Sequence, residues 1–579
     1  MNNRTKTGIE ILWVAGLMGI LGNVLLRETP WGLNASLFVA AFVAAMAMLV
    51  VRRKPEFLTR QNIALYGAMV FFAAMFSWRD SIELRIYDTF AILAIMGVLM
   101  LPALKLSVQN SGVFHYLTGF LWSGVSSAFG PAAVLSSDIE WKTILKTGWS
   151  RHLVSAIKGI AIALPMLIVF GALFVAADAA FEGMIERIFN ESAQTAFRHL
   201  FLTALFFWLT AGYFRGALHE IGSYKTTAAN NSLSIIPDLP HSSAFDKVRA
   251  EETVNADALP GNATILEHIN KEDAPKPEQV EEPKKRDWQN FDNSFIPQAF
   301  TLGAVETVVI LGLINLLFLS FVIVQVPYLF GGMELVQNTP DFKLADYARR
   351  GFGELVAVAA LVLPILLTSH WLLRKDKPSN ETIFRALAGI QIVLLFVIMA
   401  SAAQRLFLLT GSLGYGLTTI RLYPMIFMIW LAVIFVIFSL TVLRGARQYF
   451  AWAALWSAFF ILAGTHFLNP DEFIVRTNIR LMQQGRDFDG DYNAELSDDA
   501  IPAVLEALSA MGEDDQCFVK WRLHNRLIVA RDEADSRSWN LSRLTARSLL
   551  EENHNVFDDH AGCPAWMPFP ETNSGRLKY

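Results

Sequence analysis

Long apolar stretches separated by short polar segments recur from the start of the chain to about residue 468. A transmembrane helix needs about 20 consecutive, mostly uncharged residues to cross a hydrocarbon core ~30 Å thick. Eleven stretches meet this requirement: Ile9–Leu26, Gly32–Val51, Asn62–Trp78, Ile86–Leu104, Leu153–Ala177, Ala196–Ala217, Ala299–Val326, Glu354–Leu373, Ile383–Ala402, Leu422–Leu443 and Tyr449–Leu468. The pattern therefore predicts an all-α, polytopic helical membrane protein with about 11 transmembrane helices.

A further apolar segment, 113–134, is rich in glycine and serine and is a weaker candidate for a span. If it crossed the membrane, the basic residues Lys142, Lys146 and Arg151 would lie outside. That is disfavoured, because Lys and Arg in short loops collect on the cytoplasmic side. We expect 113–134 to be an interfacial or re-entrant segment.

The positions of basic residues also predict the orientation of the chain. Arg52, Arg53, Lys54 and Arg60 crowd the loop after the second span, and similar groups follow the eighth and tenth spans. With all of these in the cytoplasm, the N-terminus is cytoplasmic. The odd number of spans then places the tail after Leu468 on the outer side.

The same pattern divides the chain into four parts. Residues 1–219 form an N-terminal membrane half with six spans, and 298–468 form a C-terminal half with five. Between them, 220–297 is polar, proline-containing and mixed in charge. Such a composition buries too little apolar surface to offset the entropy of ordering, so we predict a disordered cytoplasmic linker. The fourth part, 469–579, is acidic but carries enough apolar residues to form a small, mainly helical soluble domain.

The tail contains patterns of both kinds of secondary structure. Ile501, Val504, Leu505 and Leu508 have helical spacing, and leucines between 541 and 550 suggest a second helix. Between these stripes, Val519, Trp521 and Leu523 alternate with polar residues, which favours a short strand.

The only two cysteines of the chain, Cys517 and Cys563, also lie in the tail. An oxidising compartment outside the membrane would allow them to form a disulfide. Two free thiols are the alternative if the tail is cytoplasmic.

The composition and the missing motifs of the chain exclude several classes of function. The chain is 53% hydrophobic and 17% charged, with a net charge of −5, and nothing in it suggests a nucleic-acid partner. A phosphate-binding glycine loop, a zinc-protease His pair and a nucleophile elbow are all missing. The sequence therefore offers no catalytic residue and no metal site, and we expect no cofactor.

A group of polar residues is predicted to share the outer face. They come from the loop before the eighth span, the connection between the ninth and tenth spans, and the start of the tail. They are Tyr347, Arg349, Arg350, Glu354, Arg405, Tyr415, Thr418, Arg421, Tyr423, Asn469, Asp471 and Arg476. Arginine presents a planar fork of donors that suits carboxylates and phosphates, so an anion or lipid headgroup is one candidate ligand. The alternative is that these side chains anchor helix ends or pair with one another.

Glu306 is the most isolated charge, about two turns inside the seventh predicted span. A carboxylate in a membrane needs a partner or water. Lys158 in the fifth predicted span is the cation at a similar depth. A Glu306–Lys158 contact is one hypothesis, and an end position from which Glu306 reaches the headgroups is the other.

Several short motifs resemble an uncharacterised family of bacterial membrane proteins. They are the segment 328–332, the run 346–354 that contains Tyr347, Arg349, Gly351 and Phe352, the segment Tyr415-Gly416-Leu417-Thr418 with Arg421 and Tyr423, the segment 469–471, and 538–543. This pattern resembles the domain of unknown function family 4173 and its sibling family 4153. The resemblance covers roughly 299–550 with specific motifs. It implies a bacterial inner membrane protein, and it brings no reaction, because the family has no defined activity.

Three functions are compatible with these observations. The first is a non-enzymatic envelope sensor, scaffold or assembly factor whose tail and outer-face cluster bind an anion, a lipid headgroup or an envelope protein. The second is a secondary transporter with Glu306 as coupling site. The third is a membrane enzyme acting on phosphorylated lipid or cell-wall intermediates through Glu354 or Asp471. The first is favoured, because the halves show no internal repeat and no catalytic signature is present.

Overall fold

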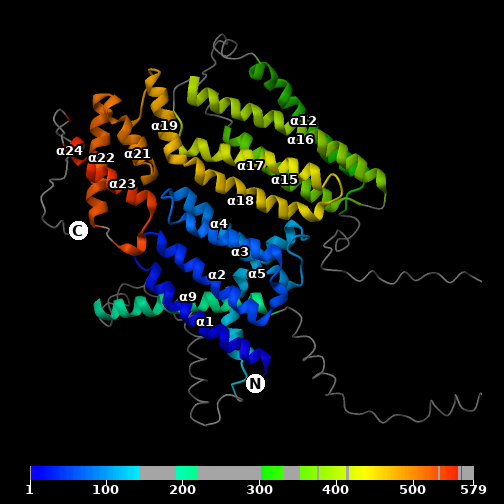
Figure 1. Cartoon of the computed structure of the whole chain (residues 1–579). Helices are drawn as coiled ribbons and strands as arrows, with labels where there is room; N and C mark the ends of the chain where they lie inside the picture. Colours follow the sequence, from blue (N-terminus) through cyan, green and yellow to red (C-terminus); the bar gives the residue numbers. More distant parts are fainter. Residues whose placement is uncertain are drawn as a thin grey trace, which may run out of the picture. The chain divides into compact units, whose positions relative to one another are not determined.

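The computed structural model describes residues 2–141, 191–219, 301–330, 352–374, 377–412, 416–532, 535–558 and 563. Within these ranges the chain is helical, and its one isolated β-bridge joins Leu302 to Leu373. Figure 1 shows the order of the helices along the chain. The predicted span 153–177 and the whole predicted linker 220–297 lie outside the described residues.

The helices of the first group belong to the N-terminal part of the chain. They are α1 (Asn3–Leu26), α2 (Leu33–Arg53), α3 (Arg60–Met75), α4 (Ile82–Val98), α5 (Val113–Ala133) and α9 (Glu191–Leu218). The second group contains α12 (Ala304–Phe330), α15 (Phe352–Leu372), α16 (Pro378–Phe407), α17 (Thr419–Thr441) and α18 (Phe450–Leu468).

Nine helices in the described part of the chain are long and apolar enough to cross a membrane. They correspond to the predicted spans except 62–78 and 153–177. The first of these exceptions is α3, which has only 16 residues. The protein is therefore an all-α polytopic membrane protein, as the sequence predicted.

Close helix packing depends on glycines. In α1, a Cβ on Gly19 would overlap the backbone of Thr203, and one on Gly22 would overlap the ring of Phe206, both in α9. Without a hydrophobic driving force between helices in lipid, such small residues let the backbones approach and gain dispersion energy. This explains why α1 and α9 lie side by side although many residues separate them (Figure 1).

Helix α5 makes close contacts with α4 and α9 through glycines. Gly119 of α5 packs against Gly97, next to the last residue of α4, and Gly130 packs against Gly212 near the end of α9. After α5, the buried carboxylate of Asp138 accepts from Arg4 at 2.9 Å and from Arg215 at 2.5 Å. The interfacial or re-entrant assignment of 113–134 stays a prediction.

Helix α18 joins the two groups. Its Phe459 packs on Phe72 of α3 with ring centroids 5.3 Å apart, and its Phe450 packs on Phe438 of α17 at 5.8 Å. Each of these two residues belongs to a different apolar core. One helix therefore contributes side chains to both cores.

The C-terminal helices, α19 to α24, follow α18. They are α19 (Pro470–Gln483), α20 (Gly490–Glu495), α21 (Ile501–Ala507), α22 (Glu513–Asp532), α23 (Leu541–Glu552) and α24 (His554–Asp558). Helices α19 to α23 share a third apolar core. Cys517 in α22 forms a disulfide with Cys563, and their Cα atoms are 5.5 Å apart.

The strand predicted around Val519–Leu523 is wrong, because this segment lies in the middle of α22. Val519, Leu523 and Leu527 are buried in the third core and are spaced by four residues. Five residues are too few to distinguish the spacing of a helix from the alternation of a strand. The continuation of the apolar positions at intervals of four residues identifies the helix.

The N-terminus and the C-terminal helices lie at opposite ends of the hairpin formed by α1 and α2. At one end, Arg53 donates to Glu10 at 2.7 Å and to Asn3 at 2.9 Å. At the other end, the amide of Leu33 donates to the carbonyl of Trp539 at 2.8 Å. The C-terminal helices therefore dock where α1 ends and α2 begins.

We predict that Gly212→Ala destabilises the protein, because a Cβ there would overlap the backbone of Ser126 and Ser127. Overpacking of this kind costs about 1–3 kcal/mol, which thermal unfolding of the purified chain in detergent would detect as a lower Tm. The matched control is Gly67→Ala in α3, where the new Cβ meets open space. That control should leave the Tm unchanged or raise it slightly, so an equal loss in both variants would contradict the packing argument.

Candidate functional site

The predicted outer-face residues are only partly described. Tyr347, Arg349 and Tyr415 lie outside the described residues, as do Arg350 and Gly351. Thr418 and Arg421 lie at the start of α17, and Asp471 lies in the first turn of α19. Glu354 is in the first turn of α15, and the buried Arg405 is in the last turn of α16.

The segment Gly416–Thr418 is held by side chains of the C-terminal helices. Asn478 of α19 accepts from the amide of Leu417 at 2.6 Å and donates to its carbonyl at 3.0 Å. The hydroxyl of Tyr492 in α20 accepts from the amide of Thr419 at 2.9 Å. Gly416 has a φ of +69°, which favours glycine, and its place beside Asn478 leaves no room for a Cβ. This family-like motif therefore fixes the C-terminal helices to α17.

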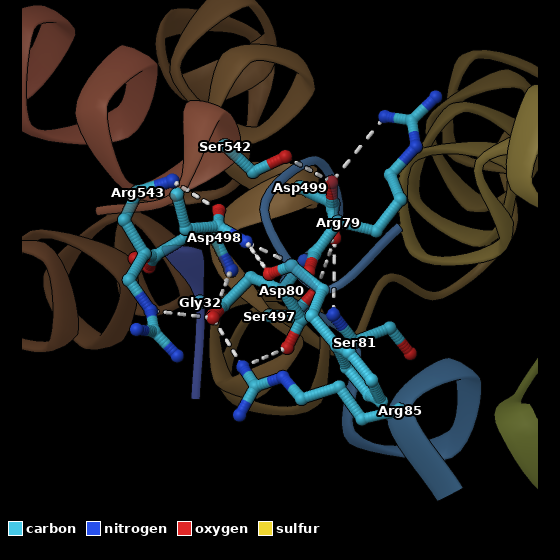
Figure 2. A network of polar contacts seen from close by, with 12 residues as sticks. Gly32, Arg79, Asp80, Ser81, Arg85, Ser497, Asp498, Asp499, Ser542 and Arg543 are labelled. Atoms are coloured by element: carbon cyan, nitrogen blue, oxygen red, sulfur yellow. Dashed lines mark hydrogen bonds and ion pairs between the residues drawn. The ribbon is translucent and has the colours of Figure 1, made fainter. Parts of the chain in front are cut away.

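A second junction forms around the carboxylate of Asp499, whose side chain is 1% exposed (Figure 2). It accepts from the backbone amides of Asp80 at 2.7 Å and Ser81 at 3.1 Å, both in the turn between α3 and α4. It also accepts from the guanidinium of Arg79 at 3.3 Å and from the hydroxyl of Ser542 in α23. A buried carboxylate is tolerated only with such donors, so Asp499 ties three segments together.

Asp80 makes the reciprocal contact: it is a carboxylate of the turn between α3 and α4 that accepts from a residue of the C-terminal helices. Its carboxylate accepts from Arg543 of α23 at 2.6 Å and from Arg85 of α4, as Figure 2 shows. The neighbouring Asp498 pairs with Arg526 of α22 at 3.0 Å. The turn between α3 and α4 thus contributes both charges, and each carboxylate contacts a cation from another element.

The backbones of α3 and α23 meet end to end. The amides of Leu541 and Ser542 donate to the carbonyls of Ser77 at 2.8 Å and Trp78 at 3.3 Å. The side-chain amide of Asn540 donates to the carbonyls of Phe76 and Arg79, both at 2.9 Å. The last carbonyls of one helix and the first amides of another have no partner within their own helix, so each end satisfies the other.

A buried pair inside the spans lies next to this junction. The imidazole Nε2 of His466 in α18 is 2.8 Å from a carboxylate oxygen of Asp88 in α4, and both side chains are almost fully buried. The carbonyl of His466 accepts from Arg79 at 3.0 Å. Arg79 therefore contacts both His466 and Asp499.

Asp471 is a buried carboxyl at the same junction. Its side chain accepts from the hydroxyl and, at 3.3 Å, the amide of Ser497. Burial raises the pKa of Asp471 to about 6, and the nearby carboxylates Glu83 and Asp499 add to the rise. Near neutral pH the buried group is thus close to taking up a proton.

The structure corrects the position of Glu306. Helix α12 begins at Ala304, so Glu306 lies in its first turn and not two turns inside the span. Its carboxylate accepts from the amide of Gly303 at 3.0 Å, an arrangement that satisfies a helix N-terminus. Lys158 lies outside the described residues, so the proposed contact between the two stays a prediction.

A cleft of about 820 Å³ opens beside the Asp499 junction. Its walls are α22 and α23, and Pro30 and Asp80 contribute from the connections between spans. Arginine is frequent on both walls: the cleft is lined by Arg522, Arg526, Arg543 and Arg547. In the described residues, no group of three or more His, Cys, Asp or Glu side chains is arranged to hold a metal ion.

The sequence did not predict the docking roles of Arg79, Asp80, Asn540 and Asp499. One signal was available: Arg79 and Asp80 are a charged pair in a short connection that the orientation rule places outside. The motif at 538–543 had been noticed only through its resemblance to a family. Its Asn540, Ser542 and Arg543 prove to be docking residues.

These features define a class of protein: a polytopic helical membrane protein that carries C-terminal helices docked on one end of its bundle. The chain belongs to the family described as Domain of unknown function (DUF4153), whose model matches residues 66–234 and 268–507. The sequence resemblance had named family 4173 first and this one as its sibling, so it was right only approximately. The match also covers much of the N-terminal half, where no specific motif had been noticed. No curated protein and no solved structure matches the chain.

We predict that Asp499→Asn destabilises the protein strongly, because it removes the charge that Arg79 and two backbone amides contact. Breaking a buried pair typically costs about 3–5 kcal/mol, which thermal unfolding in detergent would report. The matched control is Asp491→Asn, because the side chain of Asp491 is 46% exposed beside Arg522 and the loss of such a pair should cost less than about 1 kcal/mol. Similar losses in both variants would show that Asp499 does not hold the junction.

We predict a pH effect centred on Asp471. Its folded pKa of about 6 lies above the ordinary value of about 3.9, so the folded state binds more protons between these values. Stability from this group is therefore full below about pH 4 and is lost as the pH rises to about 6. Between pH 7.5 and pH 5, Asp471→Asn should remove a stabilisation of about 1.4 kcal/mol that the wild type gains on acidification. Identical pH profiles of Tm for both chains would contradict this.

Proposed function

We propose that the protein is a non-enzymatic scaffold of the bacterial inner membrane that holds its C-terminal helices in a fixed orientation on the periplasmic face. In this proposal 1–219 and 298–468 are the membrane halves, with a cytoplasmic linker between them. Residues 469–579 form the domain that meets an envelope partner or ligand. The observation that carries the proposal is the buried, charged junction around Asp499.

The character of this junction favours a permanent attachment. Two hydrogen-bonded connections, one to α17 through Asn478 and one to the α3–α4 turn through Asp499, hold the C-terminal helices at separate points. Two such connections restrict rotation as well as separation. A rigid presentation of the C-terminal helices is what a scaffold or a sensor requires.

Three observations support the periplasmic side. The C-terminal helices dock at the end of the α1–α2 hairpin opposite the N-terminus. The basic residues Arg52 and Arg53 lie at the N-terminal end, which the distribution of Lys and Arg makes cytoplasmic. The disulfide between Cys517 and Cys563 belongs to an oxidising compartment.

The positions of the carboxylates favour a scaffold over the two alternatives. Glu306 caps the start of α12, whereas a coupling site needs a carboxylate near the middle of the membrane. The carboxylates Asp80 and Asp499 are occupied by donors from several segments, whereas a general acid or base must reach a substrate. These contacts explain the two residues structurally without assigning them a reaction.

Reporter fusions test the orientation. Alkaline phosphatase joined after Asp558 should be enzymatically active in cells, because it folds only after export. The same reporter joined after Lys54, in the α2–α3 connection, should be inactive and serves as the control. Cys517 and Cys563 should resist alkylation in cells until a reductant is added. Activity of a cytoplasmic β-galactosidase fusion after Asp558 would overturn the proposal.

A further inference from the structure

The cleft between α22 and α23 has walls built from one face of each helix. On α22 the lining residues Trp521, Arg522, Asn525, Arg526 and Val529 recur at helical spacing. On α23 the lining residues Arg543, Leu544, Arg547 and Leu550 do the same. Each wall therefore presents arginines together with apolar side chains, and four carboxylates also line the cleft: Asp80, Glu495, Asp498 and Asp535.

The cleft lies at the level where the first spans end. Arg537, which belongs to the segment between the two walls, donates to the carbonyl of Val24 in α1 at 2.6 Å. Val24 is 53% exposed and lies two residues before the end of this apolar span. The lining residue Trp539 accepts from the amide of Leu33 at the start of α2. Since α1 and α2 are spans, the cleft adjoins the surface of the bilayer.

Apolar side chains on the cleft are exposed although they lie outside the spans. Trp539 is 43% exposed, Leu544 is 50% exposed and Val529 is 55% exposed. Large exposed apolar groups that gather at one place mark an interaction site, and tryptophan is enriched where protein meets the membrane surface. These three residues suit the apolar part of a ligand that enters from the lipid.

The four arginines differ in what holds them. Arg526 and Arg543 pair with Asp498 and Asp80, which belong to the docking junction. Arg522 pairs with Asp491, whose side chain is 46% exposed, and Arg547 pairs with Glu551, whose side chain is 43% exposed. Exposed pairs contribute little and are given up cheaply. Arg522 and Arg547, one on each wall, are thus the cations that a ligand can recruit without opening the junction.

We propose that this cleft binds a phosphate-bearing amphiphile, with the phosphate between Arg522 and Arg547 and the apolar part along Trp539, Leu544 and Val529. Guanidinium groups from two walls match the charge and the multiple acceptors of a phosphate. The inference names the ligand of the proposed scaffold. It depends on the nearness of the cleft to a bilayer, and not on which face of the membrane that is.

Photocrosslinking of the purified full-length chain in detergent tests the proposal. The probe is a photoreactive phosphatidylglycerol, and mass spectrometry of the digested protein measures adducts on 521–529 and 541–552. Adducts on the spans serve as the internal reference. The variant carries Arg522→Gln and Arg547→Gln together. The matched control is Arg476→Gln, because Arg476 forms the same kind of exposed pair four residues from a glutamate but lies in α19.

We expect the double variant to lose cleft adducts about tenfold relative to the spans, and Arg476→Gln to lose none. Leu544→Gln, which keeps both arginines, should also lower the yield severalfold. Excess phosphatidylglycerol should compete, whereas glycerol 3-phosphate at the same concentration should not. The proposal is overturned if the wild type shows no cleft adducts above the span reference, or if the double variant keeps them. Equal competition by glycerol 3-phosphate would refute the amphiphile and leave a site for soluble phosphate esters.

A thermal unfolding curve accompanies each variant, because a loss of adducts counts only if the Tm is unchanged. The result is independent of the fusion experiment. A cytoplasmic C-terminus would refute the periplasmic scaffold and leave lipid binding intact. A periplasmic C-terminus without cleft adducts would refute lipid binding and leave the periplasmic scaffold intact.

Discussion

The buried carboxylate of Asp499, at one end of the membrane bundle, determines how the neighbouring segments must be arranged. Asp499 is stable there only because backbone amides, a guanidinium and a hydroxyl surround it. These donors come from the α3–α4 turn and from α23, so the carboxylate fixes the distance between the bundle and the C-terminal helices. The end-to-end contact of α3 and α23 has the same origin, since unpaired carbonyls and amides must find partners. The cleft exists where it does because this docking holds α22 and α23 beside the spans.

Hydropathy predicted the fold class because the bilayer imposes a length that a sequence must meet. Two errors arose where local context mattered more than hydropathy. Glu306 was placed too deep, since the apolar run starts before the helix does and Gly303 supplies the cap contact. The strand at 519–523 was predicted from five alternating residues, whereas the buried stripe of α22 continues to Leu527 with a period of four.

The site was less accessible to sequence reasoning than the fold. Thr418, Arg421 and Asp471 were selected as ligand contacts, and the structure shows what surrounds them: Leu417 and Thr419 are held by Asn478 and Tyr492, and Asp471 by Ser497. Arg79 and Asp499 were not paired in advance, because 420 residues separate them and one sequence holds no information on so distant a contact. The cleft could not be predicted either, because its arginines come together only when α22 and α23 pack beside each other.

The separation of the two halves of the junction has a consequence for biogenesis. The α3–α4 turn is synthesised some 420 residues before Asp499, and bacterial or eukaryotic ribosomes add about 5–20 residues per second. The carbonyls of Ser77 and Trp78 precede their partners Leu541 and Ser542 by 464 residues, and they therefore lack these partners for roughly 20–90 seconds. A nascent chain that stops before its last hundred residues lacks α23, so the carbonyls in the turn between α3 and α4 stay uncovered. Such exposed polar groups are a feature by which membrane quality control can recognise an incomplete chain.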